Sequence, residues 1–469
     1  MPEGKPKADL IFSGGDIVTL DPANPYIRNA AIAVLGNEII WIGKADDVDN
    51  HFAVARRKVD FSGQVMIPGL IDSHTHLFQS LGKTLGDGLS LLPWLAKFMM
   101  PLSANISPAD AVATVRMAAL NSLLSGTTTL VDNHYAPVDE ATILGVADAM
   151  AEVGVRGVVA RGIYGPMVEG GRRMQSDARL FQYSAAEELE ITRACIKARP
   201  KGGLVEVWPM PLNVVYVDPD LMVACHELAA EFDLGWQAHC SESKFEVDIF
   251  QSVHGVRPVR WLHDQGILDD RITLAHGIWF DAEEIEMLGA AKAHVIHNPV
   301  CNQYLASGIL PLGPLMEAGV NVALGTDGTA CVGLNMFESM KSAQVLQRLR
   351  ELKPDATSSE LVLTMATRNG GRMLRRNVGT LKQGALADMT VVDLGGIHHQ
   401  PAHRPVCCLT LSTMGSDVRH VVVNGEVVVE NGRSTRVDQD KVIADCLQAS
   451  RQLIERAQIG DLVADWIEP

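Results

Sequence analysis

The chain has 469 residues, of which 47% are hydrophobic and 20% charged, with 41 Gly and 22 Pro. This composition is typical of a globular protein with a sizeable core and excludes a disordered chain. The formal net charge of −16 argues against nucleic acid or an anionic membrane as a partner, because both favour a basic surface.

The N-terminus and the cysteines indicate a cytoplasmic protein. The first residues, MPEGKPKADLIFSGGDIV, contain no apolar segment of the kind found in secretory signals. No uninterrupted apolar run is long enough to span a bilayer. The 8 cysteines are scattered without a Cys-x-x-Cys pair, which favours reduced thiols over a disulfide framework.

Both ends of the chain have the pattern of short strands separated by turns. LGNEIIWIG near the N-terminus and VVVNGEVVV near the C-terminus place turn residues between apolar strands, which is typical of hairpins. Neither end can form a core alone, so we predict one small β-sandwich domain built from residues 1–66 and 378–469. A final helix is predicted within DQDKVIADCLQASRQLIERAQ.

Between these ends, apolar strands alternate with helix-like segments. The predicted strands are 65–74, 127–134, 156–162, 204–209, 235–240, 272–276, 294–299 and 320–327. Such alternation implies a parallel sheet covered on both faces. Eight units predict an α/β fold, a (β/α)₈ TIM barrel, over residues 67–377. Ser107-Pro108 is typical of a helix start, and Gly126 and Gly319 stand where helices should end.

Polar residues follow several of these strands. In IPGLIDSHTHLFQ, His74 and His76 lie two residues apart, so their side chains point to the same side of the strand. The ends of four later strands carry His239, His276, His297 and Asp327. A single histidine at a strand end is more often structural than a ligand. Because the carboxyl ends of barrel strands converge on one mouth, the whole set predicts a shared site.

The chemistry of these residues points to a metal ion and activated water. Neutral imidazoles with one carboxylate suit Zn²⁺, with Fe²⁺ or another divalent ion as the alternative. Such an ion lowers the pKa of bound water to about 7, and Asp327 could both contact the metal and accept a proton. Glu242 follows His239 by three residues in HCSE and is the candidate general acid and base. A solvated loop carboxylate is the alternative for Glu242.

Several motifs together resemble the amidohydrolase superfamily. They are PGLIDSHTHLF, HCSE, LAH at 274–276, IHNPVCN at 296–302 and LGTDG at 324–328. The similarity is strongest to the branch of aminohydrolases and chlorohydrolases that act on N-heterocycles. This branch includes s-triazine hydrolases, S-adenosylhomocysteine and methylthioadenosine deaminases, and guanine and 8-oxoguanine deaminases. The similarity covers nearly the whole chain and is specific for the superfamily rather than for a substrate.

This resemblance implies one divalent metal ion per subunit, most simply Zn²⁺. The implied ligands are His74, His76, His239 and Asp327. His276 would be a further ligand or would polarise the attacked centre, and Glu242 would shuttle protons. The fourth strand ends with LVEVWP and has no lysine that could carry a carbamylated bridge between two metals, so a single ion is expected.

The resemblance also implies the reaction. Hydroxide formed at the metal would attack an amino-bearing ring carbon of a small N-heterocycle and release ammonia. A chlorohydrolase or an amide or urea C–N hydrolase on the same scaffold is the main alternative. A catalytically silent binding protein is a remote alternative. The sequence leaves open the heterocycle, the leaving group, the choice of Zn²⁺ or Fe²⁺ and the oligomeric state, although relatives are often dimers or larger homo-oligomers.

Substrate contacts are implied more faintly. The resemblance points to Gln79, Trp94 and Asn302, for which loop capping or ordinary core packing are the alternatives. His134, at the end of the second strand, either lines the pocket or only hydrogen-bonds the backbone. Cys331 lies where many relatives have a small-Ser-Asn run and is a candidate for the substrate's surroundings, with a structural thiol as the alternative.

Overall fold

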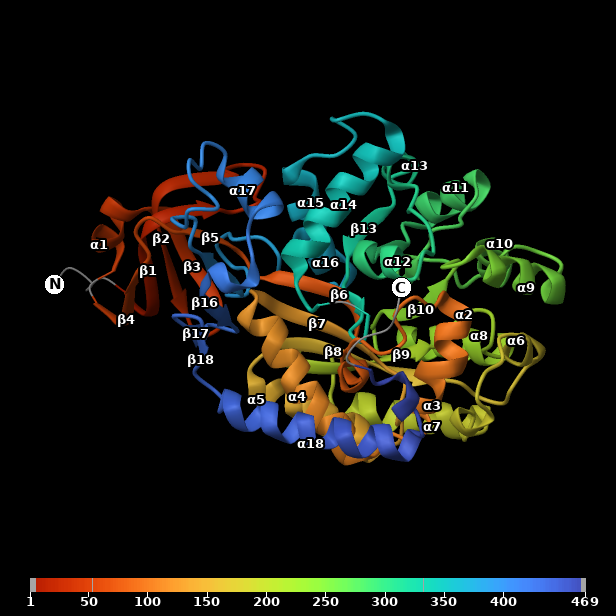
Figure 1. Cartoon of the computed structure of the whole chain (residues 1–469). Coiled ribbons are helices and arrows are strands. Elements are labelled where there is room, and N and C mark those ends of the chain that lie inside the picture. Colours follow the sequence, from red (N-terminus) through yellow and green to blue (C-terminus); the bar gives the residue numbers. More distant parts are fainter. Residues whose placement is uncertain (1–5, 53, 332, 465–469) are drawn as a thin grey trace.

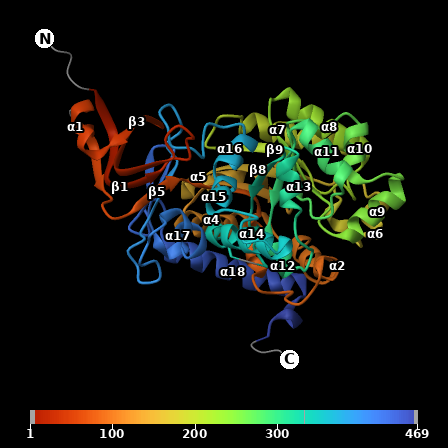
Figure 2. The same ribbon diagram turned by 90° about the horizontal axis from the view of Figure 1, so that it is seen from above.

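The computed structural model describes residues 6–52, 54–331 and 333–464 and has an α/β architecture (Figure 1). Parallel strands flanked by helices form the larger part of the molecule. A mixed sheet, made of strands from both ends of the chain, lies beside it. The view from above shows the N-terminal strands and the adjoining C-terminal segments together at one end of the molecule (Figure 2).

Two parallel sheets contain the strands predicted for the central region. Their orders are β14–β6–β7–β8–β9 and β10–β11–β12–β13. The bounds are β6 Leu70–His76, β7 Thr127–His134, β8 Arg156–Ile163, β9 Val205–Pro211, β10 Trp236–Cys240, β11 Ile272–His276, β12 His294–His297, β13 Asn321–Leu324 and β14 Asp327–Gly328. Every residue of these strands is buried, as expected for parallel strands covered on both faces.

The two parallel sheets meet at both of their edges. After β9, Asn213 forms a parallel bridge with His239 of β10. At the other edge, β13 is followed two residues later by β14, in which Asp327 pairs with Thr75 of β6. The strands therefore follow one another in chain order from β6 to β14, and the carboxyl ends of β6, β10 and β11 lie close together.

Helices connect and cover these strands. The longer ones are α4 Pro108–Leu124, α5 Glu140–Val153, α7 Ala185–Ala198, α8 Pro219–Glu231, α9 Lys244–His254, α11 Ala282–Ala291, α14 Met336–Glu351 and α18 Gln439–Ala457. The shorter ones are α1 Val48–His51, α2 Leu91–Trp94, α3 Met100–Ser103, α6 Glu169–Arg173, α10 Pro258–Asp264, α12 Pro299–Tyr304, α13 Leu312–Glu317, α15 Ser359–Met365, α16 Arg368–Met373 and α17 Pro405–Leu411. The predicted start of α4 is confirmed, since Ser107 accepts a hydrogen bond from the backbone N–H of Asp110.

The mixed sheet unites the two ends of the chain. Its order is β18–β17–β16–β15–β5–β1–β2–β3, and β4 pairs with β1. The bounds are β1 Lys7–Val18, β2 Tyr26–Leu35, β3 Glu38–Lys44, β4 Val54–Asp60, β5 Val65–Pro68, β15 Met389–Val392, β16 Val418–Val423, β17 Glu426–Glu430 and β18 Arg433–Ser434. Both predicted hairpins are confirmed, as β2–β3 and β16–β17. Phe12, Ile32 and Met389 belong to the sheet's own buried core.

The strand predicted at 65–74 is divided, which corrects the sequence-based prediction. β5 joins the mixed sheet, whereas β6 begins the parallel sheet, and Gly69 lies between them. A Cβ atom on Gly69 would lie 2.1 Å from Oγ1 of Thr128, so only glycine permits this close approach between the two parts. The predicted domain boundary between residues 66 and 67 therefore falls within β5.

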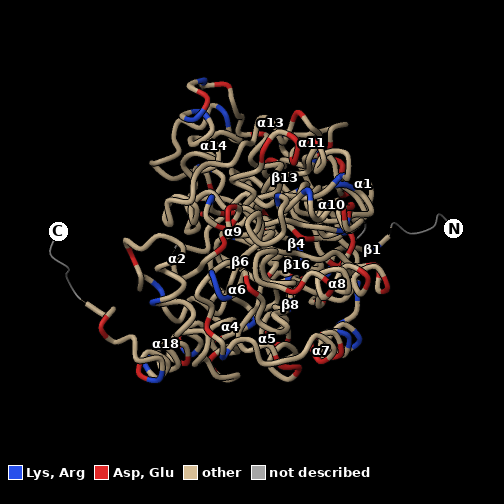
Figure 3. The backbone as a smooth tube through the Cα atoms, turned by 90° about the vertical axis from the view of Figure 1, so that its right-hand side faces the viewer, with Lys and Arg blue, Asp and Glu red and all other residues tan. Residues whose placement is uncertain are grey.

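Charged side chains lie mostly on the outside of the molecule. In Figure 3, acidic and basic residues both lie along peripheral helices such as α7 and α18. Within the described ranges, no helix combines the length and the hydropathy that a membrane crossing requires.

A buried ion pair connects the two parts of the fold. Arg156 of β8 donates from Nε to Oδ2 of Asp388 at 2.6 Å and from Nη2 to Oδ1 of the same carboxylate at 3.2 Å. Nη2 also donates to Oδ1 of Asn424 in the β16–β17 turn, at 3.0 Å. The Arg156 and Asp388 side chains are 5% and 1% exposed. The pair therefore links a parallel strand to the C-terminal part of the mixed sheet.

Arg156→Met is expected to lower the free energy of unfolding by about 3–5 kcal/mol, because the Asp388 carboxylate would remain buried without a counter-ion. A matched control is Arg116→Met, which removes a more exposed pair with Glu152 and is expected to cost less than about 1 kcal/mol. Urea-induced unfolding measures both variants. Equal losses for the two variants would contradict a structural role for the buried pair.

Candidate active site

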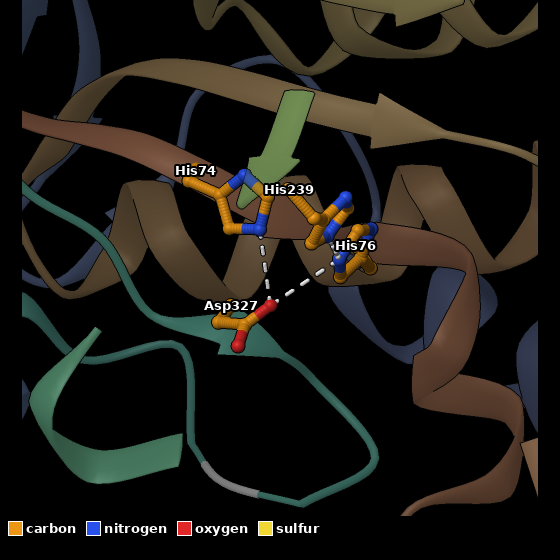
Figure 4. A group of neighbouring side chains, drawn as sticks. All are labelled: His74, His76, His239 and Asp327. Carbon is orange, nitrogen blue, oxygen red and sulfur yellow. Dashed lines mark hydrogen bonds and ion pairs between the residues drawn. The ribbon is translucent and has the colours of Figure 1, made fainter. Parts of the chain in front are cut away.

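Four side chains at the carboxyl ends of the parallel strands converge on one point (Figure 4). Nε2 of His74 and Nε2 of His76 lie 3.1 and 3.2 Å from Oδ1 of Asp327. Nε2 of His76 lies 3.1 Å from Nε2 of His239. One donor atom from each residue lies within 4.8 Å of the donor atoms of the other three. The residues come from β6, β10 and β14, which are far apart in sequence.

In each of the three histidines, the hydrogen bond made by Nδ1 fixes the tautomer and directs Nε2 toward this point. Nδ1 of His74 donates to the side-chain oxygen of Gln237 at 2.7 Å. Nδ1 of His76 donates to the backbone oxygen of Asn133 at 2.8 Å, and Nδ1 of His239 donates to the backbone oxygen of Leu212 at 2.5 Å. An oxygen of this kind can only accept, so Nδ1 carries the proton in each neutral ring. Each Nε2 therefore presents a lone pair.

Three lone pairs and a carboxylate oxygen cannot share such a small buried space without a cation. A proton could bridge one pair of these atoms, but only a metal ion can interact with all four at once. Neutral imidazole nitrogens with a carboxylate oxygen are a donor set that suits Zn²⁺. The hydrogen bonds to Nδ1 are also those that commonly orient metal-binding histidines. The residues present therefore fit a divalent metal ion.

The local backbone around Asp327 brings its carboxylate into this position. Asp72 of β6 accepts hydrogen bonds from the backbone N–H and the hydroxyl of Thr326, at 3.0 and 2.5 Å. Asp327 adopts a left-handed conformation with φ 67°, which is unfavourable for a non-glycine residue. A Cβ atom on Gly325 would lie 2.6 Å from the backbone oxygen of His74, so this turn requires glycine. Contacts with β6 thus hold a strained residue beside the histidines.

A second group of residues adjoins the first. Nε2 of His276 lies 3.5 Å from Oε2 of Glu242 and 3.7 Å from Oδ2 of Asp327. The amide nitrogen of Asn302 donates to Nδ1 of His276 at 3.0 Å, which leaves the proton of the neutral ring on Nε2. His276 therefore has the opposite tautomer to the other three histidines. It presents an N–H donor, and Nε2 has no hydrogen-bond partner in the structure.

The two carboxyl groups of the site differ in protonation. Burial raises the pKa of Glu242 well above its usual value, and the nearby Glu246 and Asp327 raise it further. Burial also favours the neutral form of Asp327, but the proximity of His276, His74 and His76 lowers the pKa of this group well below its usual value. Burial thus favours the protonated form of Glu242, whereas the neighbouring histidines favour the carboxylate form of Asp327.

Burial keeps the neighbouring imidazoles neutral. It lowers the pKa of His276 to about 4. It also lowers the pKa of His239 well below its usual value, and the proximity of His74 and His76 lowers it further. Neutral imidazole is the form that binds a metal ion or donates a single hydrogen bond.

These groups line a pocket of about 700 Å³, part of which is open to solvent. Its walls include His76, Gln79, Leu91, Trp94, Leu95, Met99, Met100, Tyr135, Tyr164, Leu180, Leu212, Tyr216, His239, Glu242, Glu246, His276, Cys301, Leu305 and Asp327. The pocket thus combines the proposed metal-binding residues with apolar walls, as is common in small-molecule sites.

Two of the predicted substrate contacts lie in this pocket. Gln79 and Trp94 are only 2% and 4% exposed and both line its wall. Nε2 of Gln79 donates to the hydroxyl of Tyr135 at 2.8 Å, which directs the side chain. Oε1 of Gln79 and Nε1 of Trp94 have no hydrogen-bond partner in the structure.

The other three predicted contacts lie elsewhere among the described residues. Asn302 is behind His276 and contacts its Nδ1. His134 is fully buried, with Nδ1 3.4 Å from Oδ2 of Asp132. Cys331 lines a neighbouring surface hollow, whereas Cys301 beside it reaches the pocket. His297, at the end of β12, is buried and belongs to none of the three groups of potential metal ligands found among the described residues.

Sequence reasoning missed the residues that orient the histidines. Gln237 accepts from His74 and donates from Nε2 to the backbone oxygen of Ser73 at 3.1 Å. It lies two residues before His239, on the same side of β10, and this spacing is a signal that could have identified it. Asn133 donates to Gln237 at 2.5 Å, completing a buried polar network.

Comparison with known proteins identifies the family. The model of the amidohydrolase family matches residues 65–428, which include all the donor residues described above. The chain belongs to the amidohydrolase family. The predictions of this superfamily and of a hydrolase, made from the sequence motifs, are thus confirmed.

Individual proteins similar to this amidohydrolase cover nearly its whole length. A 5-methylthioadenosine/S-adenosylhomocysteine deaminase from Syntrophobacter fumaroxidans is 34% identical over 94% of the chain and 97% of the relative. An adenosine deaminase from Xanthomonas campestris, whose structure has bound zinc, is 25% identical with a TM-score of 0.86, covering 97% of this chain and 100% of that one. An atrazine chlorohydrolase from Arthrobacter aurescens, also in complex with zinc, is 25% identical with a TM-score of 0.86, covering 94% and 100%.

Proposed function

We propose that this amidohydrolase is a metal-dependent deaminase that hydrolyses an amino-bearing carbon of a small N-heterocycle and releases ammonia. The observation that carries the proposal is the convergence of three Nε2 lone pairs and Asp327 beside the buried Glu242, in the lining of one pocket. The names of the Syntrophobacter and Xanthomonas relatives, both deaminases of adenosine compounds, support it.

The proposed cofactor is one divalent metal ion per chain, held by His74, His76, His239 and Asp327. The zinc in the Xanthomonas and Arthrobacter structures favours Zn²⁺, and Fe²⁺ is the alternative. When bound, such an ion would lower the pKa of a coordinated water to about 7 and so make hydroxide accessible at neutral pH. His276 is assigned as a hydrogen-bond donor rather than a further ligand, because Asn302 leaves the proton on Nε2.

The protein's own groups then have distinct roles. Asp327 is a carboxylate that accepts a proton from the attacking water. Glu242 carries a proton in the resting site and donates it to a ring nitrogen, which makes the adjacent carbon more electrophilic. The Nε2–H of His276 lies between the two carboxyl groups and can donate to the oxygen that attacks this carbon. As the C–N bond breaks, the proton held by Asp327 passes to the leaving amine and the ionised Glu242 takes up the hydroxyl proton of the attacked carbon, so ammonia departs and both carboxyl groups return to their starting forms.

A chlorohydrolase is the second candidate, favoured by the structural similarity to the Arthrobacter enzyme. The same site would activate water, and chloride would leave without the protonation that an amine requires. A silent binding protein is disfavoured, because the donor set and both carboxyl groups are intact. Gln79 and Trp94 are the proposed substrate contacts, and Asn302 acts through His276.

The remaining architectural proposals follow from the same observations. We propose that the two parallel sheets form one closed (β/α)₈ barrel over residues 67–377. Support comes from the Asn213–His239 bridge and the β14–β6 pairing at the two sheet junctions. Residues 1–66 and 378–469 would form the small β-sandwich domain. The eight free cysteines support a reducing cytoplasm, and a homodimer or larger homo-oligomer remains part of the proposal.

Removing a ligand or its support should change metal binding by different amounts. The purified protein is expected to contain about one equivalent of zinc per chain, and His239→Ala should lose it. Gln237→Met should weaken zinc affinity by about 10–100-fold, because His74 loses the acceptor that orients its ring. Plasma mass spectrometry and competition with a chromogenic chelator measure these effects. Full zinc content and affinity in both variants would contradict the assignment.

Glu242→Gln should lower kcat by about 10²–10⁴-fold, because the amide cannot transfer a proton. Zinc content should remain at the wild-type level, since Glu242 is not among the proposed ligands. A neighbouring control is Glu338→Gln, a change outside the pocket, which should leave kcat unaltered. Full activity of the Glu242 variant would remove the proposed proton donor from the mechanism.

A substrate panel tests the reaction itself. Ammonia and chloride release are measured in parallel for adenosine compounds, other purines, pterins, and amino- and chloro-substituted triazines. Ammonia from at least one heterocycle is the expected result. Release of chloride alone would favour the chlorohydrolase. A zinc-loaded protein that hydrolyses only simple amides or ureas would exclude both activities on heterocycles.

A further inference from the structure

Much of the wall of the active-site pocket is apolar. The residues that form it are Leu91, Trp94, Leu95, Met99, Met100, Leu180, Leu212 and Leu305. Among the wall residues that the structure describes, none is Lys or Arg. The polar residues that line the same pocket include Gln79, Ser176 and Asn213 besides the proposed metal-binding and proton-transfer groups. A ligand that places its ring near Asp327 would therefore extend its substituent along aliphatic and thioether side chains.

The ionisable carboxyl groups of the pocket would disfavour an anionic substituent. They are Glu242, Glu246 and Asp327. Glu246 accepts hydrogen bonds from the amide of Asn213 and the backbone N–H of Ser243, both at 2.8 Å, so its oxygens are already engaged in the fold. A substrate carboxylate would lose its water in a pocket that contains three carboxyl groups and, among the described wall residues, no cation.

Two unpartnered polar atoms provide contacts for a neutral ring. Oε1 of Gln79 is an acceptor and Nε1 of Trp94 is a donor, and both are buried on the pocket wall. A neutral heterocycle with ring nitrogens and an N–H group can satisfy both without bringing a charge into the pocket. The pocket thus offers hydrogen-bond partners for a heterocyclic ring, but no cationic partner for a charged substituent among its described wall residues.

A lysine lies in a surface hollow that adjoins the pocket. This hollow shares Leu91 and Leu305 with the pocket and includes Lys244. Lys244 is 66% exposed and donates to Asp248 at 2.9 Å, so it is already paired and well solvated. An ion pair between Lys244 and a carboxylate on a long substituent would therefore add little binding free energy.

On the basis of the proposed function, we propose that this deaminase selects neutral N-heterocycles with an apolar substituent and discriminates against those whose substituent carries a carboxylate. Methylthioadenosine and S-adenosylhomocysteine form a suitable pair, because both contain adenosine with a 5′ thioether. Only S-adenosylhomocysteine adds an amino-acid group. The relative from Syntrophobacter is named for both compounds, so this selectivity would distinguish the present chain from it.

The test compares kcat/KM for the two compounds with the zinc-loaded enzyme, using ammonia release. Methylthioadenosine should exceed S-adenosylhomocysteine by at least about 100-fold. The same comparison with an alkylamino-substituted aminotriazine and its carboxyalkylamino counterpart tests a second ring class. Comparable turnover of the charged and neutral members of a pair would overturn this inference while leaving the deaminase proposal intact. No ammonia from any neutral heterocycle in the panel would overturn both.

Leu91 is the position at which to change the selectivity. It begins α2, is half-buried and lies between the pocket and the adjoining hollow, so an arginine head group there can remain partly solvated. Leu91→Arg should reduce the ratio between the neutral and charged compounds by at least about tenfold. The matched control Leu91→Gln introduces a long polar side chain without a charge and should not favour the charged compound.

Lys244→Ala tests the alternative route for a charged tail. The ratio of the two kcat/KM values should stay the same, because Lys244 lies outside the pocket wall. A selective loss of S-adenosylhomocysteine turnover in this variant would show that Lys244 serves a charged substrate and would overturn the inference. Circular dichroism melting of all three variants establishes that they are folded before the ratios are compared.

Discussion

The site depends on the mutual repulsion of electron-rich atoms that the fold brings together. His74, His76 and His239 each use Nδ1 to donate to an oxygen of the protein, so each directs an Nε2 lone pair toward the Asp327 carboxylate. Such an arrangement would be unfavourable in a buried, low-dielectric space without a cation. The binding of a metal ion therefore follows from the tautomers and not only from the presence of histidines.

The surrounding structure stabilises this arrangement at several points. Asp72 holds the turn before Asp327, and Gly325 allows the turn to approach β6. Both Asp327 and His276 have positive φ values, 67° and 78°, and such strained residues are often found at functional sites. Asn302 donates to Nδ1 of His276, so this ring has the opposite tautomer to the other three histidines. His276 therefore presents an N–H donor, whereas the other three rings present lone pairs for a metal ion. One cluster of histidines thus supplies two kinds of chemistry.

The four metal-binding residues could be predicted from the sequence. Each follows an apolar strand that is visible in the sequence, and the carboxyl ends of parallel barrel strands lie close together. The period of two identified His74 and His76, and the convergence of strand ends brought His239 and Asp327 to them. The role of Gln237 could not be predicted, because it depends on contact with a residue 163 positions away. The division at Gly69 depends on the approach of Thr128, which is equally non-local. In the sequence, the wall residues Leu180 and Leu305 cannot be distinguished from ordinary core residues. The apolar lining of the pocket could therefore be recognised only from the structure.

Anomalous diffraction at the zinc edge from crystals of the purified protein tests the central claim most directly. We predict one strong peak, about 2.0–2.2 Å from Nε2 of each of the three histidines and from an oxygen of Asp327. His276 should lie outside the coordination shell, with Asn302 on its Nδ1. An active enzyme whose anomalous peak lies elsewhere, or in which these four residues surround no ion, would contradict the account.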